Sequence, residues 1–223
     1  MYTVHKDTME TAKKKRPPVR KTFRHGNLRR ALLEAGIALA REGGPSAVVL
    51  REATRRAGVA PNAAYRHFSS HSELLQAVRA AAISSLALPI EAEIAGMRRS
   101  RLPVESARAT LRAVGTGYLK FALAETGLFR TAFSVPERVE GDVDAAKAGK
   151  SGLNPFQLLS AALDLMVEAG ALPRERRQGA EYLAWSAVHG LAFLIIEGPL
   201  SRSSQKEIHA ISDRLLQMVE KGL

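Results

Sequence analysis

The sequence predicts an all-α protein in which a small N-terminal domain of three helices precedes a larger helical domain, with about nine helices in all. Alanine, leucine, arginine and glutamate recur throughout the 223 residues, and this mixture favours helices over sheets. Apolar residues recur at helical spacings, and no segment alternates convincingly with a period of two. Charge also divides the chain: residues 1–70 hold 15 lysines and arginines against 5 acidic residues, whereas residues 71–223 hold 18 against 17.

The composition limits the class of protein. The chain has no cysteine, which excludes disulfides and thiolate metal sites. It has no run of 18 apolar residues and no apolar leader segment, so we expect a cytoplasmic protein without a membrane span. No residue pattern indicates a metal or a cofactor. A basic N-terminal part on a nearly neutral body is typical of nucleic-acid binders, although a solubilising tail or attraction to anionic lipid would give the same charge.

Residues 1–22 are expected to form a disordered basic arm, because they are polar and two prolines interrupt any helix there. The basic side chains of this arm are those of Lys13, Lys14, Lys15, Arg16, Arg20 and Lys21. Such an arm could contact DNA phosphates or the minor groove beside the main site, or it could be an unordered leader.

Residues 23–70 are expected to hold three short helices. The first runs from a cap at Asn27 to Gly43, with apolar residues at spacings of four, three and four. The second runs from Leu50 to Ala57, and the third from Pro61 to about Phe68. The second and third are joined by a tight turn, which is the layout of a helix-turn-helix.

Residues 71–223 are expected to form the second domain. A helix over 71–88, capped by Ser70, connects the two domains, and Pro89 ends or kinks it. Further helices are expected over 90–98, 103–126, 128–134, 155–170, 175–197 and 204–221. Residues 136–152 contain few apolar side chains and predict a mobile loop.

The segment from Leu50 to Leu75 resembles the N-terminal domain of the TetR family of transcriptional regulators. The matching motifs are the turn Ala57-Gly58-Val59, the end of the recognition helix Tyr65-Arg66-His67-Phe68, and the pair Leu74-Leu75. The segment Trp185–Gly190 is similar to a Trp-His-Gly signature in the C-terminal domain of one subgroup. The two resemblances together cover most of the chain. They imply a homodimeric, sequence-specific transcriptional regulator, usually a repressor, and not an enzyme.

The resemblance also implies which residues contact double-stranded DNA. Tyr65 is similar to the tyrosine whose hydroxyl contacts a phosphate, and Arg51 and Arg66 occupy positions suited to phosphate or base contacts. Phe68 resembles the buried aromatic residue that holds the recognition helix on the core. The candidate DNA-binding residues are Arg51, Asn62, Ala63, Tyr65, Arg66, His67 and His71.

The chain departs from the family pattern at three positions. Val49 stands where a threonine or serine usually caps the second helix and touches a phosphate, and valine can do neither through its side chain. His71 stands where a lysine usually contacts the DNA backbone, and histidine is mostly neutral at pH 7. Thr54 replaces a common alanine. We expect these changes to affect DNA affinity more than the fold.

For the C-terminal domain, the resemblance implies a dimer interface of four helices and a pocket for a small apolar effector. The helix around Trp185 and the last helix would form the interface, with apolar surface from Tyr182, Trp185, Leu191, Phe193 and Ile195. The effector would favour a conformation whose two recognition helices no longer fit the DNA. The candidate lining residues, each of which could equally be plain core, are Phe121, Phe129, Phe133, Met166, Trp185 and His189.

Other readings of the sequence have weaker support. Gly149-Lys150-Ser151 resembles the end of a phosphate-binding loop, but Asp144 stands where that loop needs glycine. His67 and His71 are four residues apart, yet no carboxylate completes a metal site. A DNA-binding protein without sequence preference is an alternative. Another alternative is a protein of this fold that acts through partners other than DNA. This alternative stays open because Val49 and His71 depart from the residues with which the family contacts DNA.

Overall fold

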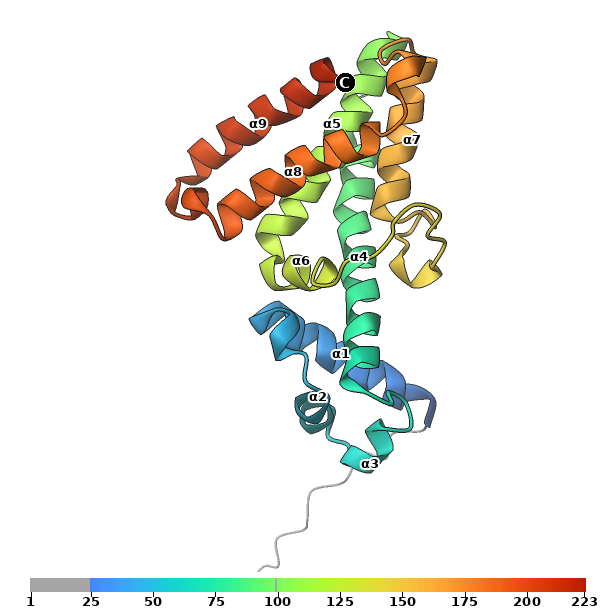
Figure 1. Ribbon diagram of the computed structural model, residues 1–223, viewed down its shortest axis with the longest axis vertical. Coiled ribbons are helices and arrows are strands. Elements are labelled where there is room, and N and C mark those ends of the chain that lie inside the picture. The colour runs from blue at the N-terminus through green and yellow to red at the C-terminus, as the bar shows by residue number, and fades with distance from the viewer. Residues whose placement is uncertain (1–24, 99) are drawn as a thin grey trace, which may run out of the picture.

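The computed structural model describes residues 25–98 and 100–223, and every regular element within these ranges is a helix. This confirms the predicted all-α class. A small three-helix unit lies at one end of the molecule, and the long helix α4 runs from it into the larger helical part (Figure 1). The helices of this first part are α1 (His25–Gly43), α2 (Leu50–Ala57), α3 (Pro61–Ala64) and α4 (His71–Gly96). The predicted basic arm, residues 1–22, lies outside the described residues.

Two predicted helix ends in the three-helix unit are wrong. Helix α1 begins at His25, so Asn27 lies inside the helix and not at its cap. Helix α3 ends at Ala64, not near Phe68, because the next turn tightens: the His67 and Phe68 N–H groups both donate to the Ala64 carbonyl.

Helix α4 continues through Pro89 to Gly96, so it does not end at the proline, and the separate helix predicted over 90–98 is part of α4. A proline inside a helix removes one main-chain hydrogen bond and costs about 3 kcal/mol. Packing offsets this cost, because Leu86, Ala87 and Ile90 around the proline are all buried. Helix α5 lies against this stretch, and its Gly117 lets the two backbones approach closely.

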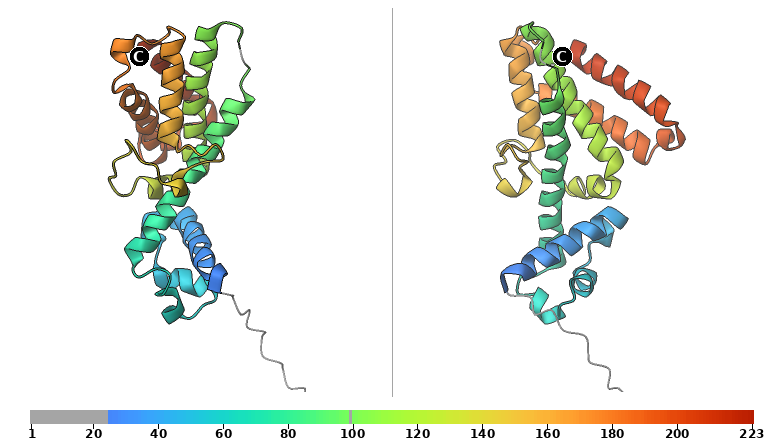
Figure 2. Two further views of the ribbon diagram at one scale, coloured as in Figure 1. Left: turned by 90° about the vertical axis from the view of Figure 1, so that its right-hand side faces the viewer. Right: turned by 180° about the vertical axis from the view of Figure 1, so that it is seen from behind.

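The remaining helices surround the far end of α4. Helices α5 and α7 pack along it, while α8 and α9 lie side by side on one flank (Figures 1 and 2). Their bounds are α5 (Pro103–Ala124), α6 (Thr126–Ala132), α7 (Pro155–Glu168), α8 (Ala180–Ile196) and α9 (Gln205–Gly222), with 3-10 turns η1 (Pro45–Ala47), η2 (Ala145–Lys147), η3 (Arg174–Arg176) and η4 (Pro199–Arg202).

Helix α6 joins the three-helix unit to the rest of the molecule. Its Gly127 lies so close to the end of α1 that an added Cβ would be 2.2 Å from the Ala40 carbonyl oxygen. An ion pair between Arg41 and Glu125 spans 2.8 Å at the same place. The two parts therefore meet through backbone-to-backbone packing, in addition to the continuous helix α4.

Helix α4 is the one described helix that is long and apolar enough to cross a membrane by length and composition. Its packing explains that composition, because α1, α5, α6 and α7 all contact it. The core helix of a globular protein and a membrane span have similar sequences when the core helix is covered on several sides.

The exposed face of α8 differs from the one expected. Leu191 and Ile195 are buried inside the chain itself, and Trp185 is half-buried. Tyr182 and Phe193 are exposed as expected, and the other exposed apolar side chains of α8 are those of Leu183 and Leu194. The helix is apolar on nearly all sides, so the periodicity of the sequence does not distinguish the inner face from the outer one.

Candidate nucleic-acid interface and internal cavity

The turn between α2 and α3 has the geometry that the sequence predicts. Gly58 ends α2 in the left-handed conformation, with φ 67° and ψ 32°. The Val59 N–H donates to the Thr54 carbonyl across 3.1 Å, which closes the turn. Phe68 is fully buried beneath, with the Arg29 guanidinium 4.8 Å above its ring. The turn therefore fixes α3 against α1 and α2 and leaves its outer side uncovered.

Most of the candidate DNA-binding residues are exposed in and around the helix-turn-helix. Tyr65 is 57% exposed and follows the last residue of α3. Ala63 and His67 are half-buried, and Ala63 packs against the core. The exposed candidates are Arg51, Asn62, Tyr65, Arg66 and His71.

Two of the three arginines of α2 are held in ion pairs with glutamates. Arg56 donates two hydrogen bonds of 2.6 Å to Glu42, which ties α2 to α1. Arg55 pairs in the same bidentate way with Glu52 on its own helix. Within the described ranges, Arg51 and Arg66 pair with no carboxylate, so their guanidinium groups are available to phosphates or bases.

Helix α4 begins beside this surface. The Ser70 hydroxyl accepts a hydrogen bond of 3.1 Å from the Glu73 N–H, which confirms the predicted cap. The Glu73 carboxylate accepts from the Ser69 N–H and hydroxyl, and these hydrogen bonds hold its pKa below the usual value. His71 is therefore the exposed first residue of a well-capped helix.

Val49 leaves the start of α2 uncapped, as the sequence predicts. Its backbone has the extended conformation of a cap residue, φ −107° and ψ 127°, but no side-chain hydrogen bond reaches the helix. Val49→Ser should raise the free energy of unfolding by about 1 kcal/mol, because its hydroxyl can accept from a free N–H of α2. Denaturant unfolding measures this, with Val49→Ala as the control without a hydroxyl. An equal gain from both substitutions would contradict the capping explanation.

The larger helical part contains an inner cavity and an outer groove. The inner cavity holds about 90 Å³ and lies among α4, α5, α7, α8 and α9. The groove holds about 370 Å³ and opens beside α8. The residues that line both, and so separate them, are Ile83, Phe133, Glu137, Val139 and Trp185. The inner cavity is smaller than the ~150 Å³ that can hold benzene, so a ring-sized ligand must extend into the groove or displace side chains.

A hydrogen-bonded group of three side chains lies at this boundary. The Trp185 indole N–H donates to the Tyr118 hydroxyl across 3.1 Å, and that hydroxyl lies 2.7 Å from Nδ1 of His189. Because tryptophan can only donate, the Tyr118 hydroxyl accepts from it; which of the neutral hydroxyl and the neutral His189 ring donates in the second hydrogen bond depends on the His189 tautomer. Burial supports both protonation states, because it raises the pKa of Tyr118 and lowers that of His189.

The candidate effector residues fall into two sets. Phe133 and Trp185 line both cavities, and His189 lines the groove. Phe121, Phe129 and Met166 are buried and line neither. Tyr118 was missed by the sequence analysis. Its partners are 67 and 71 residues away, so no local pattern indicates that it joins them.

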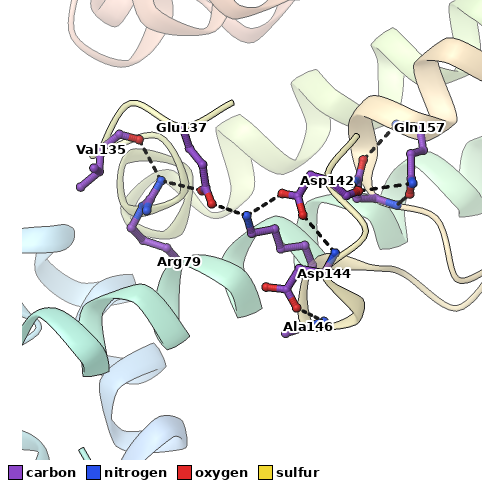
Figure 3. Close-up of polar contacts among 9 residues, drawn as sticks. Arg79, Val135, Glu137, Asp142, Asp144, Ala146 and Gln157 are labelled. Atoms are coloured by element: carbon purple, nitrogen blue, oxygen red, sulfur yellow. Dashed lines mark hydrogen bonds and ion pairs between the residues drawn. The ribbon is translucent and has the colours of Figure 1, made fainter. Parts of the chain in front are cut away.

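A chain of charged side chains, some of which line the two cavities, is linked by hydrogen bonds and ion pairs (Figure 3). The Lys147 ammonium donates to Glu137 and to Asp142, each across 2.6 Å, and Glu137 also faces Arg79 of α4. Burial alone would raise the pKa of Asp142, but the hydrogen bonds from Lys147 and from the Asp144 N–H, together with the positive charge of Lys147, hold that pKa below its usual value. The connection between α6 and α7, predicted as a mobile loop, is therefore held to α4 by the Arg79–Glu137 ion pair and by the hydrogen bonds that Lys150 and Ser151 donate to Glu91 of α4. The low apolar content of this segment gave no sign of that.

A three-helix unit with an exposed recognition segment, joined to a helical body with an internal cavity, defines a helix-turn-helix DNA-binding regulator. The family model for bacterial regulatory proteins of the TetR family matches residues 32–78. The model described as the tetracyclin repressor-like C-terminal domain matches residues 111–219. The chain therefore belongs to the TetR family. A comparison with curated proteins finds no match.

Several solved structures have the same fold. A protein with unknown function from Rhodococcus sp. RHA1 is 25% identical, covers 89% of this chain and 98% of its own, and has a TM-score of 0.67. A putative TetR family transcription regulator from Shewanella sp. PV-4 is 17% identical over 84% and 95%, with a TM-score of 0.57. RolR, solved in complex with resorcinol, is 17% identical over 87% and 88%, with a TM-score of 0.56.

Proposed function

We propose that this chain is a cytoplasmic, homodimeric repressor that binds a palindromic operator and is released from it by a small apolar effector. It acts by binding and not by catalysis, and it belongs to the subgroup with the Trp-His-Gly signature. The observation that carries the proposal is the exposed recognition surface around Tyr65 and Arg66, fixed on a buried aromatic core by the Gly58 turn.

The homodimer is supported by the outer flank of the molecule. Leu183, Phe193 and Leu194 of α8 are between 43% and 63% exposed, and Met218 of α9 is 61% exposed. Large apolar side chains on adjoining helices are typical of an interface. A second copy of the chain, related by a twofold axis, would cover them and place two recognition segments on one face of the DNA.

Release by an effector is supported by the contacts of α6. Phe129 of this helix and Phe133 just after it pack against His189, at ring centroid distances of 5.4 and 4.9 Å. Gly127, at the other end of the same seven-residue helix, packs on the backbone of α1. A ligand that displaces Phe133 would therefore shift the element on which α1 rests, and the two recognition segments would change their spacing.

The test is selection from random duplex DNA at near-physiological salt, with sequencing of the retained fraction. An enriched palindrome with half-sites about 34–36 Å apart, or slightly more, supports the proposal. Retention of DNA without an enriched motif would contradict sequence-specific binding and would indicate non-specific binding to phosphates. Failure to retain any DNA would favour a protein of this fold that acts through other partners.

Arg66→Ala should weaken binding to the selected operator by about 5- to 150-fold, because each lost specific contact costs about 1–3 kcal/mol. Titration at several salt concentrations separates two roles. Loss of a base contact relaxes the preference at one operator position, whereas loss of a phosphate contact lowers the salt dependence by about one ion. Arg176→Ala, an exposed arginine in η3, is the matched control. Unchanged affinity in Arg66→Ala would remove this residue from the interface.

A further inference from the structure

Two buried cations lie at the charged end of the cavities. The side chain of Arg79 on α4 is 7% exposed, and that of Lys147 in η2 is 9% exposed. Arg79 lines the groove, and Lys147 lines the inner cavity. Buried cations are costly unless a negative charge faces them, so the two sites need carboxylates.

Glu137 supplies one carboxylate to both cations. Its Oε1 lies 2.6 Å from Nζ of Lys147, and its Oε2 lies 3.3 Å from Arg79. Glu137 lines both cavities and therefore stands where they meet. Its side chain is 35% exposed and comes from a connection without regular structure, so it can leave for water more readily than a side chain of the core.

The pairing of Glu137 with Arg79 is incomplete. One terminal nitrogen of Arg79 donates to the Val135 carbonyl across 2.8 Å and reaches Glu137 only at the longer distance. Nε of Arg79 is buried and has no hydrogen-bond partner. A carboxylate usually meets the arginine fork through two parallel hydrogen bonds, and here one of them is missing. Arg79 can therefore accommodate a better-placed acceptor than Glu137.

We propose that Glu137 is a tethered substitute for the carboxylate of the effector, so that the effector is a small monocarboxylate with an apolar or aromatic body. The carboxylate binds between Arg79 and Lys147 in place of Glu137, and the body lies in the groove beside Phe133 and Trp185. This inference rests on the proposed function, because it names the chemical class of the effector that the cavity would bind.

The charge of the site favours a monoanion. Asp142 lies 2.6 Å from Lys147 and neutralises one of the two buried cations, which leaves one positive charge for Glu137 or for a ligand. A neutral molecule leaves that charge without a partner once Glu137 moves, and a dianion adds an unpaired negative charge. The departure of Glu137 also breaks an ion pair that holds the α6–α7 connection to α4, the helix that carries the recognition unit.

The test compares the full-length chain with Glu137→Ala by thermal unfolding and calorimetry, without DNA. The probes are benzoate, phenylacetate and hexanoate, each beside its neutral amide at matched ionic strength. Glu137→Ala should bind at least one of these acids at least tenfold more tightly than the parent chain does. The neutral amides should bind Glu137→Ala no more tightly than they bind the parent chain. Arg79→Met in the Glu137→Ala background should abolish the gain.

Glu140→Ala is the matched control, since it removes a carboxylate of the same connection that lines neither cavity. Equal binding of acids by the parent chain and Glu137→Ala, or equal effects of acids and amides, would overturn the inference. The DNA selection separates its failure from that of the proposed function. If the chain selects an operator but binds none of the acids, it is a repressor whose effector belongs to another chemical class. If the chain binds the acids but selects no operator, the proposed carboxylate site is supported and the proposed repressor function is contradicted.

Discussion

Phe193→Glu should convert the proposed dimer to a monomer and weaken operator binding by about a hundredfold or more. Phe193 lies near the end of α8 and is 53% exposed in the single chain. A glutamate there would place an unpaired charge in the proposed interface, on each side of the twofold axis. A monomer presents a single recognition segment and loses the second half-site. Light scattering after size-exclusion chromatography gives the mass, and titration with the selected operator gives the affinity.

Leu102→Glu is the matched control for this prediction. Leu102 precedes α5 and is 58% exposed, comparable to Phe193, but it lies outside the α8–α9 flank. The substitution should leave both the mass and the operator affinity unchanged. If Phe193→Glu remained a dimer, the interface would lie elsewhere. If both variants dissociated, the effect would come from added charge in general.

Gly117→Ala should lower the free energy of unfolding by about 3 kcal/mol. A Cβ at this position would lie 2.5 Å from Cα of Ile90, 2.6 Å from its nitrogen and 2.8 Å from the carbonyl carbon of Pro89. All three are backbone atoms, so no side chain can rotate away and α4 and α5 must separate. Their contact is the most extensive between any two described helices. Denaturant unfolding monitored by circular dichroism measures the loss.

The control for helix propensity is Gly96→Ala, at the last residue of α4. No described atom lies within 4 Å of a Cβ added there, and its φ is not positive. Alanine favours helix over glycine, so this variant should be neutral or more stable by up to about 1 kcal/mol. A Gly117→Ala variant as stable as Gly96→Ala would mean that the close approach of α4 and α5 does not exist in solution.

The helix-turn-helix could be predicted from the sequence because its determinants are local. Gly58, with its positive φ, and the Ser70 cap each act within five residues of their partners, so nearby positions carry the whole signal. The exposure of Tyr65 and Arg66 follows from that geometry once Phe68 is buried. The contacts that these residues make with DNA stay a prediction.

The errors in the predicted helices have a common cause. Local propensity places a helix end at Pro89, yet burial of Ile90 against α5 outweighs the lost hydrogen bond. The periodicity of α8 cannot distinguish its buried face from its exposed face, because apolar residues surround the helix. In both places the deciding energy comes from residues far away in the sequence.

The sequence by itself determined the all-helical class, the basic N-terminal third and the recognition unit, because composition and short-range patterns are sufficient for these. Only the tertiary structure brought Tyr118 to His189 and Arg79 to Glu137, across 71 and 58 residues. It also brought Glu137 and Asp142 of the α6–α7 connection within hydrogen-bond distance of Lys147. Such polar contacts need a cavity formed by several helices. Burial then makes each pairing necessary, and burial at these positions depends on the packing of the whole domain.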